Sequence, residues 1–417
     1  MGTNMTCMRK ALAVGALLAL LGPIGGSTAE TFGARVIVST TLNDTLQFFD
    51  AASLEQLQPA LPSKGAGPVR LWIQRFDERD FLFAANHGLA EGSVGVFDLS
   101  GGLATELPLS PFPSRPGSVG ITAGFMRAGP SGGAIPVVVV TNASQALAGC
   151  DVPNGSITVF NASQLDSTGR LDEISTLYGT VEASAPQPWA VSIDPVSGYA
   201  FASTNCGDGL DTIALGWGPH NCYPTDPLCP EVVAYRKTTR SAGDGADGTV
   251  FDTDHGLNYT VNIGGSSVSV HDADSRDALL TLALPGAGPI DATFGTSPQG
   301  RAWLITANGS DDSISIIDRD MLAACVVALS PSCNAEIARI ATAVPGGAPE
   351  GVAYDSATNR VFVVNKSFPP SLSVIQLTEH TGGPITGEDI HQIPLNALGL
   401  DVPVPAVIAF DVVVQPR

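Results

Sequence analysis

The sequence predicts an all-β fold, a seven-bladed β-propeller built from four-stranded antiparallel blades. Three observations predict it: a strand pattern that recurs seven times, a partner strand before each copy, and a first blade assembled from both ends of the chain. The composition agrees, because 46 glycines and 31 prolines in 417 residues suit short strands and tight turns better than a helical bundle. A hydrophobic content of 44% is enough for a large core.

The third strand of each predicted blade is the easiest to find. Each copy alternates an apolar residue with a small or polar one, which is the period of a strand with two different faces. The copies occupy residues 45–50, 93–98, 156–161, 231–236, 267–272, 313–318 and 371–376.

A second, more apolar strand precedes each copy, and in six blades it ends at an asparagine. Asparagine suits a strand end because its side chain bonds to nearby backbone and tolerates turn geometry. Some of these asparagines, such as Asn142 and Asn365, start glycosylation sequons, but their position in the repeat gives them a structural reason. The six are Asn86, Asn142, Asn205, Asn262, Asn308 and Asn365, and residues 36–40 form the corresponding strand of the first blade.

An innermost strand completes each blade, and in all copies but one it opens with a proline. Proline is tolerated there because the first residue of a strand need not donate to the ladder. The last copy lies at the C-terminus, whereas the N-terminal part begins with a second strand, so both chain ends build one blade and close the ring. The copies are residues 68–74, 116–122, 188–194, 246–252, 289–295, 349–355 and 405–411.

Residues 348–355 (APEGVAYD) and 359–365 (NRVFVVN) resemble the YVTN-type β-propeller repeat family. The resemblance extends over essentially the whole chain after residue 29 and implies the propeller architecture. It does not imply one activity, because propellers of this kind include lactonase-like enzymes, amine dehydrogenase-like subunits and surface-layer binding proteins.

Residues 1–29 read as an export signal. Arg9 and Lys10 precede an apolar stretch at residues 11–21, and small residues at 27–29 suit cleavage. We therefore expect a periplasmic or extracellular protein whose propeller occupies residues 30–417. A retained anchor is the alternative, but the stretch is short for a membrane span, and no second long apolar run follows.

Six cysteines follow residue 29, an even number in an exported chain, which favours disulfides over thiol chemistry. Metal ligation is the competing interpretation, although no pair has the CxxC spacing of a zinc site. The pairs we expect are Cys150 with Cys206, Cys222 with Cys229, and Cys325 with Cys333.

The formal net charge of −20 argues against nucleic acid or an anionic membrane surface as a partner, because both would be repelled. We expect a protein or small-molecule ligand instead, and a monomeric chain. No HExxH or Walker A motif is present. The acidic run at residues 244–254 lacks the EF-hand spacing and fits a strand and turn better than a calcium loop.

Two places on the ring could hold a binding site, and the first is the loop-rich face. The longest insertions, residues 143–155 and 206–230, are expected on the face where the innermost strands begin, and long ordered loops commonly bind partners. Trp217, His220 and Tyr223 make the later insertion a candidate recognition loop, with a packed, disulfide-held loop as the structural alternative. His87 follows a strand-end asparagine on the same face.

The second candidate is the mouth of the central channel, just after the prolines of the innermost strands. Arg70, Trp189, Asp247, Asp291 and Glu350 are expected to converge there. Such a group could bind a divalent cation or a small polar ligand, or hold a carboxylate ready for proton transfer. Solvated carboxylates at strand starts are the alternative. The positions compared are residues 69–70, 117–118, 189–190, 247–248, 290–291, 350–351 and 406–407.

Together these features predict an exported binding or scaffold module that acts through its loop-rich face. A periplasmic enzyme of the lactonase-like or amine dehydrogenase-like type, with an axial pocket, is the alternative. No residue is assigned a catalytic role from the sequence. Ionisable groups that converge in a concave axial pocket would favour the enzyme, and an exposed aromatic patch would favour the binding module.

Overall fold

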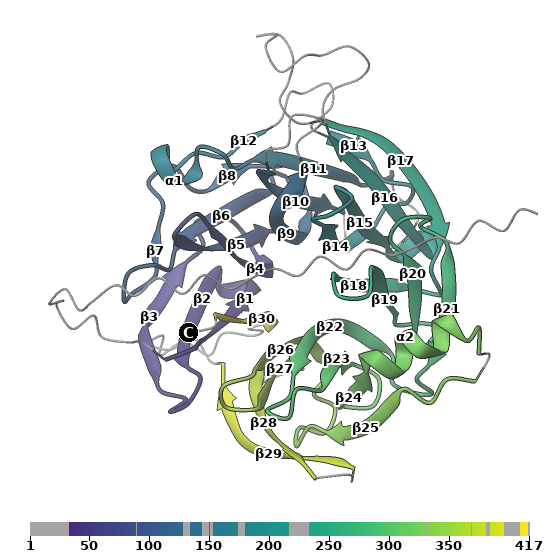
Figure 1. Ribbon diagram of the computed structural model, residues 1–417. Coiled ribbons are helices and arrows are strands. Elements are labelled where there is room, and N and C mark those ends of the chain that lie inside the picture. Colours follow the sequence, from purple (N-terminus) through teal and green to yellow (C-terminus); the bar gives the residue numbers. More distant parts are fainter. Residues whose placement is uncertain are drawn as a thin grey trace, which may run out of the picture. The chain divides into compact units, whose positions relative to one another are not determined.

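The computed structural model describes residues 33–88, 90–127, 134–143, 150, 153–173, 180–216, 233–330, 332–367, 369–380, 384–395 and 409–415. Within these residues the strands form seven antiparallel sheets, and the fold is an all-β seven-bladed propeller (Figure 1). The described strands belong to the unit Phe32–Arg417. The expected export signal at residues 1–29 lies outside the described part. Among the described residues, no helix is long and apolar enough to cross a membrane.

The innermost strand of each blade lies beside the innermost strands of the two neighbouring blades, so seven strands surround the axis. Four of them open with a proline, at the one position where the ladder needs no donor. In chain order they are β4 (Pro68–Phe76), β9 (Ser118–Arg127), β14 (Pro188–Asp194), β18 (Ala246–Asp252), β22 (Pro289–Thr296), β26 (Pro349–Asp355) and β30 (Ala409–Gln415).

The second strand of each blade is buried on both faces. In the run of four valines in β10, Val138 and Val140 pack against the preceding blade, whereas Val137 and Val139 pack against the following one. This two-sided burial explains why these strands read as continuous apolar runs. They are β1 (Arg35–Thr40), β5 (Arg79–Asn86), β10 (Ala134–Asn142), β15 (Tyr199–Thr204), β19 (Leu257–Asn262), β23 (Ala302–Asn308) and β27 (Arg360–Asn365).

Six of the seven third strands coincide with the copies that the sequence predicts, all but that of the fourth blade, and each pairs antiparallel with its neighbours in the sheet. They are β2 (Thr45–Asp50), β6 (Ser93–Asp98), β11 (Ser156–Asn161), β16 (Gly209–Gly216), β20 (Ser267–Asp272), β24 (Ser313–Asp318) and β28 (Ser371–Glu379).

The outermost strands vary in length from blade to blade, and two blades carry two short pieces in place of one strand. They are β3 (Gln56–Pro62), β7 (Thr105–Glu106), β8 (Phe112–Pro113), β12 (Asp172–Glu173), β13 (Thr180–Glu182), β17 (Val233–Ser241), β21 (Ala278–Ala283), β25 (Glu336–Ala341) and β29 (Ile385–Pro394). The described helical segments are η1 (Thr41–Asn43), α1 (Leu165–Thr168), η2 (Asn205–Gly207) and α2 (Arg319–Val327).

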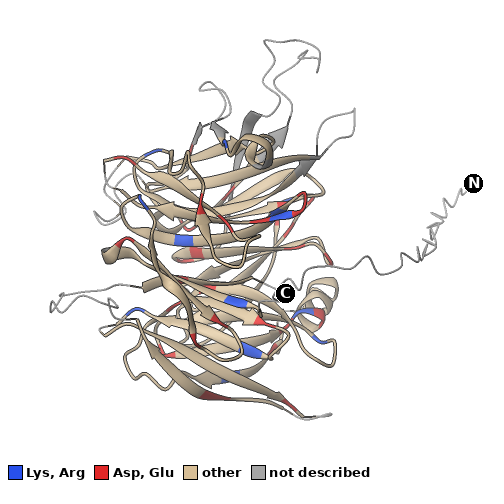
Figure 2. Cartoon of the chain, turned by 90° about the vertical axis from the view of Figure 1, so that its left-hand side faces the viewer, with Lys and Arg blue, Asp and Glu red and all other residues tan. Residues whose placement is uncertain are grey.

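Charged side chains are spread over strands and turns, with basic residues interspersed among acidic ones in the side view of Figure 2. Several basic residues are held in surface ion pairs, such as Arg75 with Asp80 at 2.8 Å. Exposed pairs of this kind contribute little to stability, so the acidic balance mainly describes the surface.

The strand-end asparagines are buried, and their side chains do more than shape a turn. The amide of Asn308 donates to the hydroxyls of Ser313 and Ser315, each at 2.9 Å, across the pair of β23 and β24. Asn262 and Asn365 bond to two serines of their own blades in the same way. The repeated Ser-x-Ser at the start of the third strand is therefore the partner of the asparagine.

The first blade is closed by the C-terminal strand, as the sequence predicts. β30 pairs antiparallel with β1, so that Val36 lies opposite Val414 and Val38 opposite Val412. Both β1 valines and Val412 belong to one apolar cluster with residues of the seventh blade. The ring is closed by side-chain packing as well as by the ladder.

Two disulfides lie in the described residues, and both pairs are among those expected. Cys150–Cys206 joins the segment before β11 to η2 and so links the third and fourth blades. Cys325–Cys333 links α2 to the segment before β25. Cys222 and Cys229 lie outside the described residues.

Two innermost strands begin later than the sequence suggested. In the third blade Ser118, not Pro116, lies opposite Asn142, and the left-handed Gly117 (φ 76°) belongs to the preceding turn. In the first blade Ala409, not Pro405, lies opposite Thr40. In the third blade Pro116 precedes the strand, and a proline in the turn before a strand gives the same spacing as one at its start. Pro405 lies outside the described residues.

The fourth blade differs most from its prediction. Its third strand is β16, whereas residues 231–236 overlap the outermost strand β17. Asp211 hides the alternating strand pattern of β16, because a charged residue stands at a buried position. Its carboxylate accepts the backbone N–H of Ser184 at 2.7 Å. Thr204 ends β15, and Asn205 lies in η2. Residues 217–232 consequently connect β16 to β17. β16 begins at Gly209, which pairs with Thr204, and ends at the other face of the ring.

Candidate functional site

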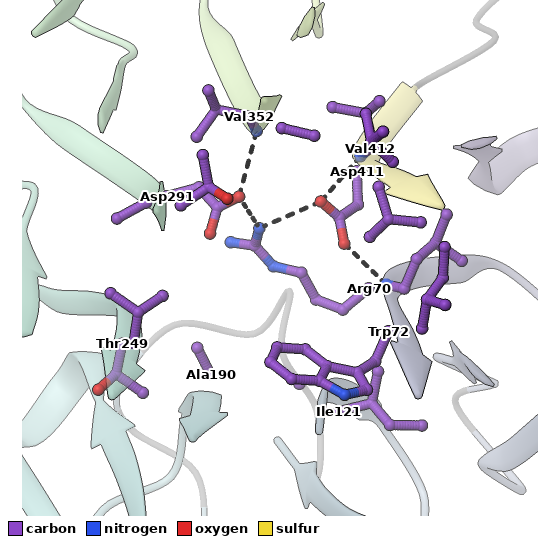
Figure 3. A pocket seen from close by; sticks show the side chains of 18 of the residues that line it. Arg70, Trp72, Ile121, Ala190, Thr249, Asp291, Val352, Asp411 and Val412 are labelled. Carbon is purple, nitrogen blue, oxygen red and sulfur yellow. Dashed lines mark hydrogen bonds and ion pairs between the residues drawn. The ribbon is translucent and has the colours of Figure 1, made fainter. Parts of the chain in front are cut away.

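A cavity of about 220 Å³ lies on the propeller axis, and every innermost strand contributes to its wall. Figure 3 shows that the polar groups of this wall gather on one side, where Asp291 and Asp411 point toward Arg70. One lining residue from each strand is Arg70, Gly120, Ala190, Thr249, Asp291, Val352 and Asp411.

A break in strand register next to the start of each innermost strand positions these side chains. The ladder shifts between Pro68 and Arg70 in β4, and between Pro289 and Asp291 in β22. A bulge of this kind inserts an unpaired residue and changes the direction of the side chain that follows. The pairing of β30 with β1 shifts in the same way, between Val38 and Thr40 of β1. The shift lies at Asp411 in β30, whose side chain faces the axis.

Arg70 is the centre of the polar cluster. Its Nη1 lies 3.0 Å from Asp291 Oδ2 and 3.8 Å from Asp411 Oδ1, and its Nη2 lies 3.9 Å from Asp247 Oδ1. The side chains of these four residues are 7–15% exposed. One guanidinium therefore faces carboxylates from three other blades in a nearly dry environment.

Backbone groups fix two of the carboxylates. Asp411 Oδ2 accepts the N–H of Leu71 at 2.7 Å, and its Oδ1 accepts the N–H of Val412 at 2.8 Å. Asp291 Oδ2 accepts the N–H of Val352 at 3.2 Å. Each of these aspartates also ties its own blade to the next one in the ring, which gives it a structural role.

A second ion pair adjoins the cluster. Lys366 Nζ lies 3.4 Å from Glu350 Oε1 and 4.5 Å from the centre of the Phe410 ring. The Glu350 side chain is 5% exposed, whereas Lys366 is 38% exposed. Lys366 thus reaches from the surface to a buried carboxylate.

The charges of the cluster do not balance, because four carboxylates (Asp247, Asp291, Glu350 and Asp411) face Arg70 and Lys366. Burial raises the pKa of Asp411 to about 7, against the opposing effect of Arg70. Burial also raises the pKa of Asp247, Asp291 and Glu350. Burial alone would lower the pKa of Arg70, but the carboxylates raise it above its usual value. The arginine stays charged, and the carboxylates compete for too little positive charge.

Two buried polar atoms of the cluster make no hydrogen bond to the described residues. They are Nη2 of Arg70 and Oδ1 of Asp247, whose 3.9 Å separation is too long for a direct bond. The indole Nε1 of Trp72, beside the cavity, also lacks a partner there. A buried polar group without a hydrogen bond is costly. Arg70 and Trp72 therefore offer unused donors to the cavity that they line, and Asp247 in the adjoining cluster keeps an unused acceptor.

The structure brings together four of the residues expected at the channel mouth, Arg70, Asp247, Asp291 and Glu350. Trp189 is half-buried and packs near Val119 and Ala143, away from the cavity wall. His87 lies near the backbone of Gly117 and Ser118, and burial lowers the pKa of its imidazole. Trp217, His220 and Tyr223 lie outside the described residues.

Two members of the cluster were missed from the sequence. Asp411 was expected at the far end of its strand, because the strand was aligned from Pro405, so that residues 406–407 were placed at the axis. Lys366 follows the strand-end asparagine of β27, the same position as His87 in its blade, and could have been found by that comparison.

A divalent cation does not fit this geometry well. Among the described residues, no three histidine, cysteine, aspartate or glutamate side chains come together as metal ligands. Arg70 occupies the space between Asp291, Asp411 and Asp247, where a metal would have to lie. The acidic run at residues 244–254 supplies turn contacts, since Asp252 Oδ1 accepts the N–H groups of Asp254 and His255.

Comparison with known proteins supports the fold. No family model matches the chain, and no curated protein sequence matches it. Among solved structures, a candidate 6-phosphogluconolactonase from Bacteroides fragilis is 15% identical with a TM-score of 0.61, and the alignment covers 94% of this chain and 100% of that one.

Two other solved structures are similar to the same extent. A functionally unknown protein from Desulfotomaculum acetoxidans is 10% identical with a TM-score of 0.56, covering 86% of this chain and 95% of that one. Hydrazine synthase from Kuenenia stuttgartiensis is 15% identical with a TM-score of 0.54, covering 85% and 99%. At such low identity the likeness is one of architecture. The chain is a seven-bladed propeller that resembles lactonase-like and YVTN-like propellers in structure.

Proposed function

We propose that this protein binds a small organic cation in the axial cavity. One observation carries the proposal: among the described residues, four buried carboxylates face two cationic groups, Arg70 and Lys366, so the cluster is acidic when all its groups are ionised. A ligand with a positive charge would relieve the repulsion between the carboxylates. It would also replace protons that the raised pKa values retain.

An anionic ligand suits the cavity less well. Arg70 is already paired with Asp291, and an incoming phosphate or carboxylate would meet the remaining acidic groups. The names of two similar solved structures point to a phosphorylated lactone, which carries the wrong charge for this cluster. The proposal therefore places binding at the axis and not on the loop-rich face.

A panel of three molecules of equal size tests the sign of the charge. Ethanolammonium, ethylene glycol and glycolate differ mainly in being cationic, neutral and anionic. In calorimetric titrations at pH 8 we expect ethanolammonium to bind at least tenfold more tightly than the other two. The Asp291→Asn variant should lose most of this preference, and Asp274→Asn on the surface should keep it. Equal affinity for all three molecules would refute the proposal.

A hydrolase is the second candidate, and the carboxyl group of Asp411 supports it. A carboxyl group with a pKa of about 7 can accept and return a proton at neutral pH. The unpartnered Nη2 of Arg70 could donate to a carbonyl oxygen of a substrate. Hydrolysis of unphosphorylated aldonolactones by the purified protein, lost in Asp411→Asn, would establish this activity and displace the simple binding role.

Export to the periplasm or the exterior is part of the same proposal. The apolar segment at residues 11–21 and two disulfides support an oxidising compartment. Mass spectrometry of the secreted protein would test it, with a mature N-terminus near residue 30 as the expected result.

A further inference from the structure

A second cavity, of about 400 Å³, adjoins the first along the axis. Trp72, Val250, Ala292 and Thr293 line both cavities, so the two are consecutive parts of one channel. The second cavity, here called the apolar chamber, is lined mainly by the later residues of five innermost strands, β4, β9, β14, β18 and β22.

The channel changes character along its length. Successive residues of a strand alternate between its two faces, so Arg70, Trp72 and Gln74 of β4 project to the same side. Arg70 lines the cavity that holds the carboxylates, Trp72 lines both cavities, and Gln74 lines the chamber. At about 3.3 Å per residue, the distance along β4 from Arg70 to Gln74 is about 13 Å. One end of the channel therefore carries the charged groups, whereas the described wall of the chamber has no charged side chain and is mainly apolar, with Phe125, Phe251 and Phe294 beside a few uncharged polar residues such as Gln74.

The chamber walls are held in place by packing outside the channel. The Phe125 ring meets Phe76 edge to face at 5.4 Å, and the Phe251 ring stacks on Phe201 at 5.9 Å. The Arg319 guanidinium lies 4.5 Å from the centre of the Phe294 ring. These contacts fix the aromatic walls before any ligand enters, which favours binding in a preformed pocket.

We propose that the ligand of the axial site is an organic cation with an apolar chain. This inference rests on the proposed function and specifies its substrate class. The positive group would lie in the axial cavity beside Asp291 and Asp411, which line it next to Arg70, and the chain would pass Trp72 into the apolar chamber. Burial of each methylene would strengthen binding, because apolar surface leaves water.

A series of straight-chain ammonium ions measures the contribution of the chamber. Ethyl-, butyl-, hexyl- and octylammonium are titrated calorimetrically at pH 8, with 1-octanol as the uncharged control. We expect affinity to rise about three- to fourfold per added methylene until the chamber is full. Octanol should bind at least tenfold more weakly than octylammonium, because it lacks the charge.

A variant that fills the chamber separates the two cavities. Gly124 lines the chamber, and a Cβ added there meets only Ile193 Cδ1, at 3.9 Å. Gly124→Leu should keep ethylammonium binding within threefold and remove the dependence on chain length. Gly101→Leu, in an exposed turn, is the matched control. The milder Gly124→Val replaces it if the leucine variant does not fold. The rise of affinity with chain length is measured in the unaltered protein and depends on neither variant.

The outcomes distinguish the two proposals. Ammonium ions that bind with one affinity at every chain length would overturn the chamber and leave the axial cation site standing. A protein that binds none of the ammonium ions would overturn both. A chain-length slope that survives unchanged in Gly124→Leu would place the chain elsewhere and overturn the chamber.

Discussion

The backbone N–H of Leu71 in β4 donates to Asp411 Oδ2 in β30 at 2.7 Å. This bond joins a residue close to the end of the chain to the second blade, which is not the blade that β30 completes. The same carboxylate lies near Arg70, so ring closure and the charge of the axial cavity depend on one side chain. Four predictions follow from this arrangement and from the repeat.

The pH dependence of stability should reveal the protonation of Asp411. The pKa of Asp411 is raised to about 7 in the folded protein, above the usual 3.8. The native state therefore binds more protons than the unfolded state between about pH 4 and pH 7, and stability falls as the pH rises through this window. The loss reaches at most about 1.4 kcal/mol per pH unit for one group.

Asp411→Asn should remove this part of the pH dependence, since asparagine can still accept from Leu71. Thermal unfolding between pH 4 and pH 8 measures it, with Asp274→Asn on the surface as the control. An Asp411→Asn protein whose Tm falls with pH as steeply as that of the unaltered protein would contradict the assignment.

Replacing Arg70 by leucine should destabilise the protein by about 3–5 kcal/mol at pH 8, because buried carboxylates lose their counter-charge. The loss should be smaller at pH 5, where the carboxyl group of Asp411, with its pKa raised to about 7, holds its proton. Urea unfolding at the two pH values measures both numbers. Arg75→Leu, which breaks an exposed pair with Asp80, should change stability by less than about 1 kcal/mol. Equal losses at pH 5 and pH 8 would argue against charge imbalance in the cluster.

Removing β30 should prevent formation of a stable monomer. A chain that ends at residue 408 lacks Val412 and leaves one edge of β1 without a partner. We expect aggregation or loss of cooperative unfolding in size-exclusion chromatography and thermal circular dichroism. A chain that ends at Gln415 is the control and should behave normally. A monodisperse protein with an unchanged Tm would disprove closure by the C-terminal strand.

Asn308→Ala should cost about 1–3 kcal/mol, because the hydroxyls of Ser313 and Ser315 lose a buried donor. Chemical denaturation compares this variant with Asn154→Ala, a surface change that we expect to be nearly neutral. The triple variant that also changes Ser313 and Ser315 to alanine should recover part of the loss. Failure of the triple variant to recover stability would assign the cost to packing and not to hydrogen bonding.

Most of the fold could be predicted from local patterns, and the errors have identifiable physical causes. The alternation of residues 313–318 reports a strand with two different neighbours, and it gave the correct register. The third strand of the fourth blade was predicted wrongly because it contains a buried charged residue, Asp211. The carboxylate of Asp211 accepts a hydrogen bond from Ser184 of another segment, which no local pattern reveals. The alignment of the last strand from Pro405 was wrong, because Ala409 lies opposite Thr40 and this register depends on pairing with the other end of the chain.

The candidate site was only partly accessible from the sequence for a related reason. Arg70, Asp291 and Glu350 each follow the first proline of an innermost strand by one or two residues, so the repeat indicates that they converge. Asp411 could be placed only after β30 was paired with β1, and its register depends on the opposite end of the chain. The charge imbalance and the apolar chamber arise from side chains of several blades, so they become visible only in three dimensions.

The valines of β10 face two different neighbours, which has a consequence for how this architecture can be divided. A single sector removed from the ring would expose apolar side chains on both of its faces, and it would lack the neighbouring side chains that bury them. Protease nicks, insertions or exchanges of single sectors should therefore be felt first in the adjoining ones. Hydrogen exchange should show that neighbouring sectors open together, because each one contributes part of the apolar packing of the next.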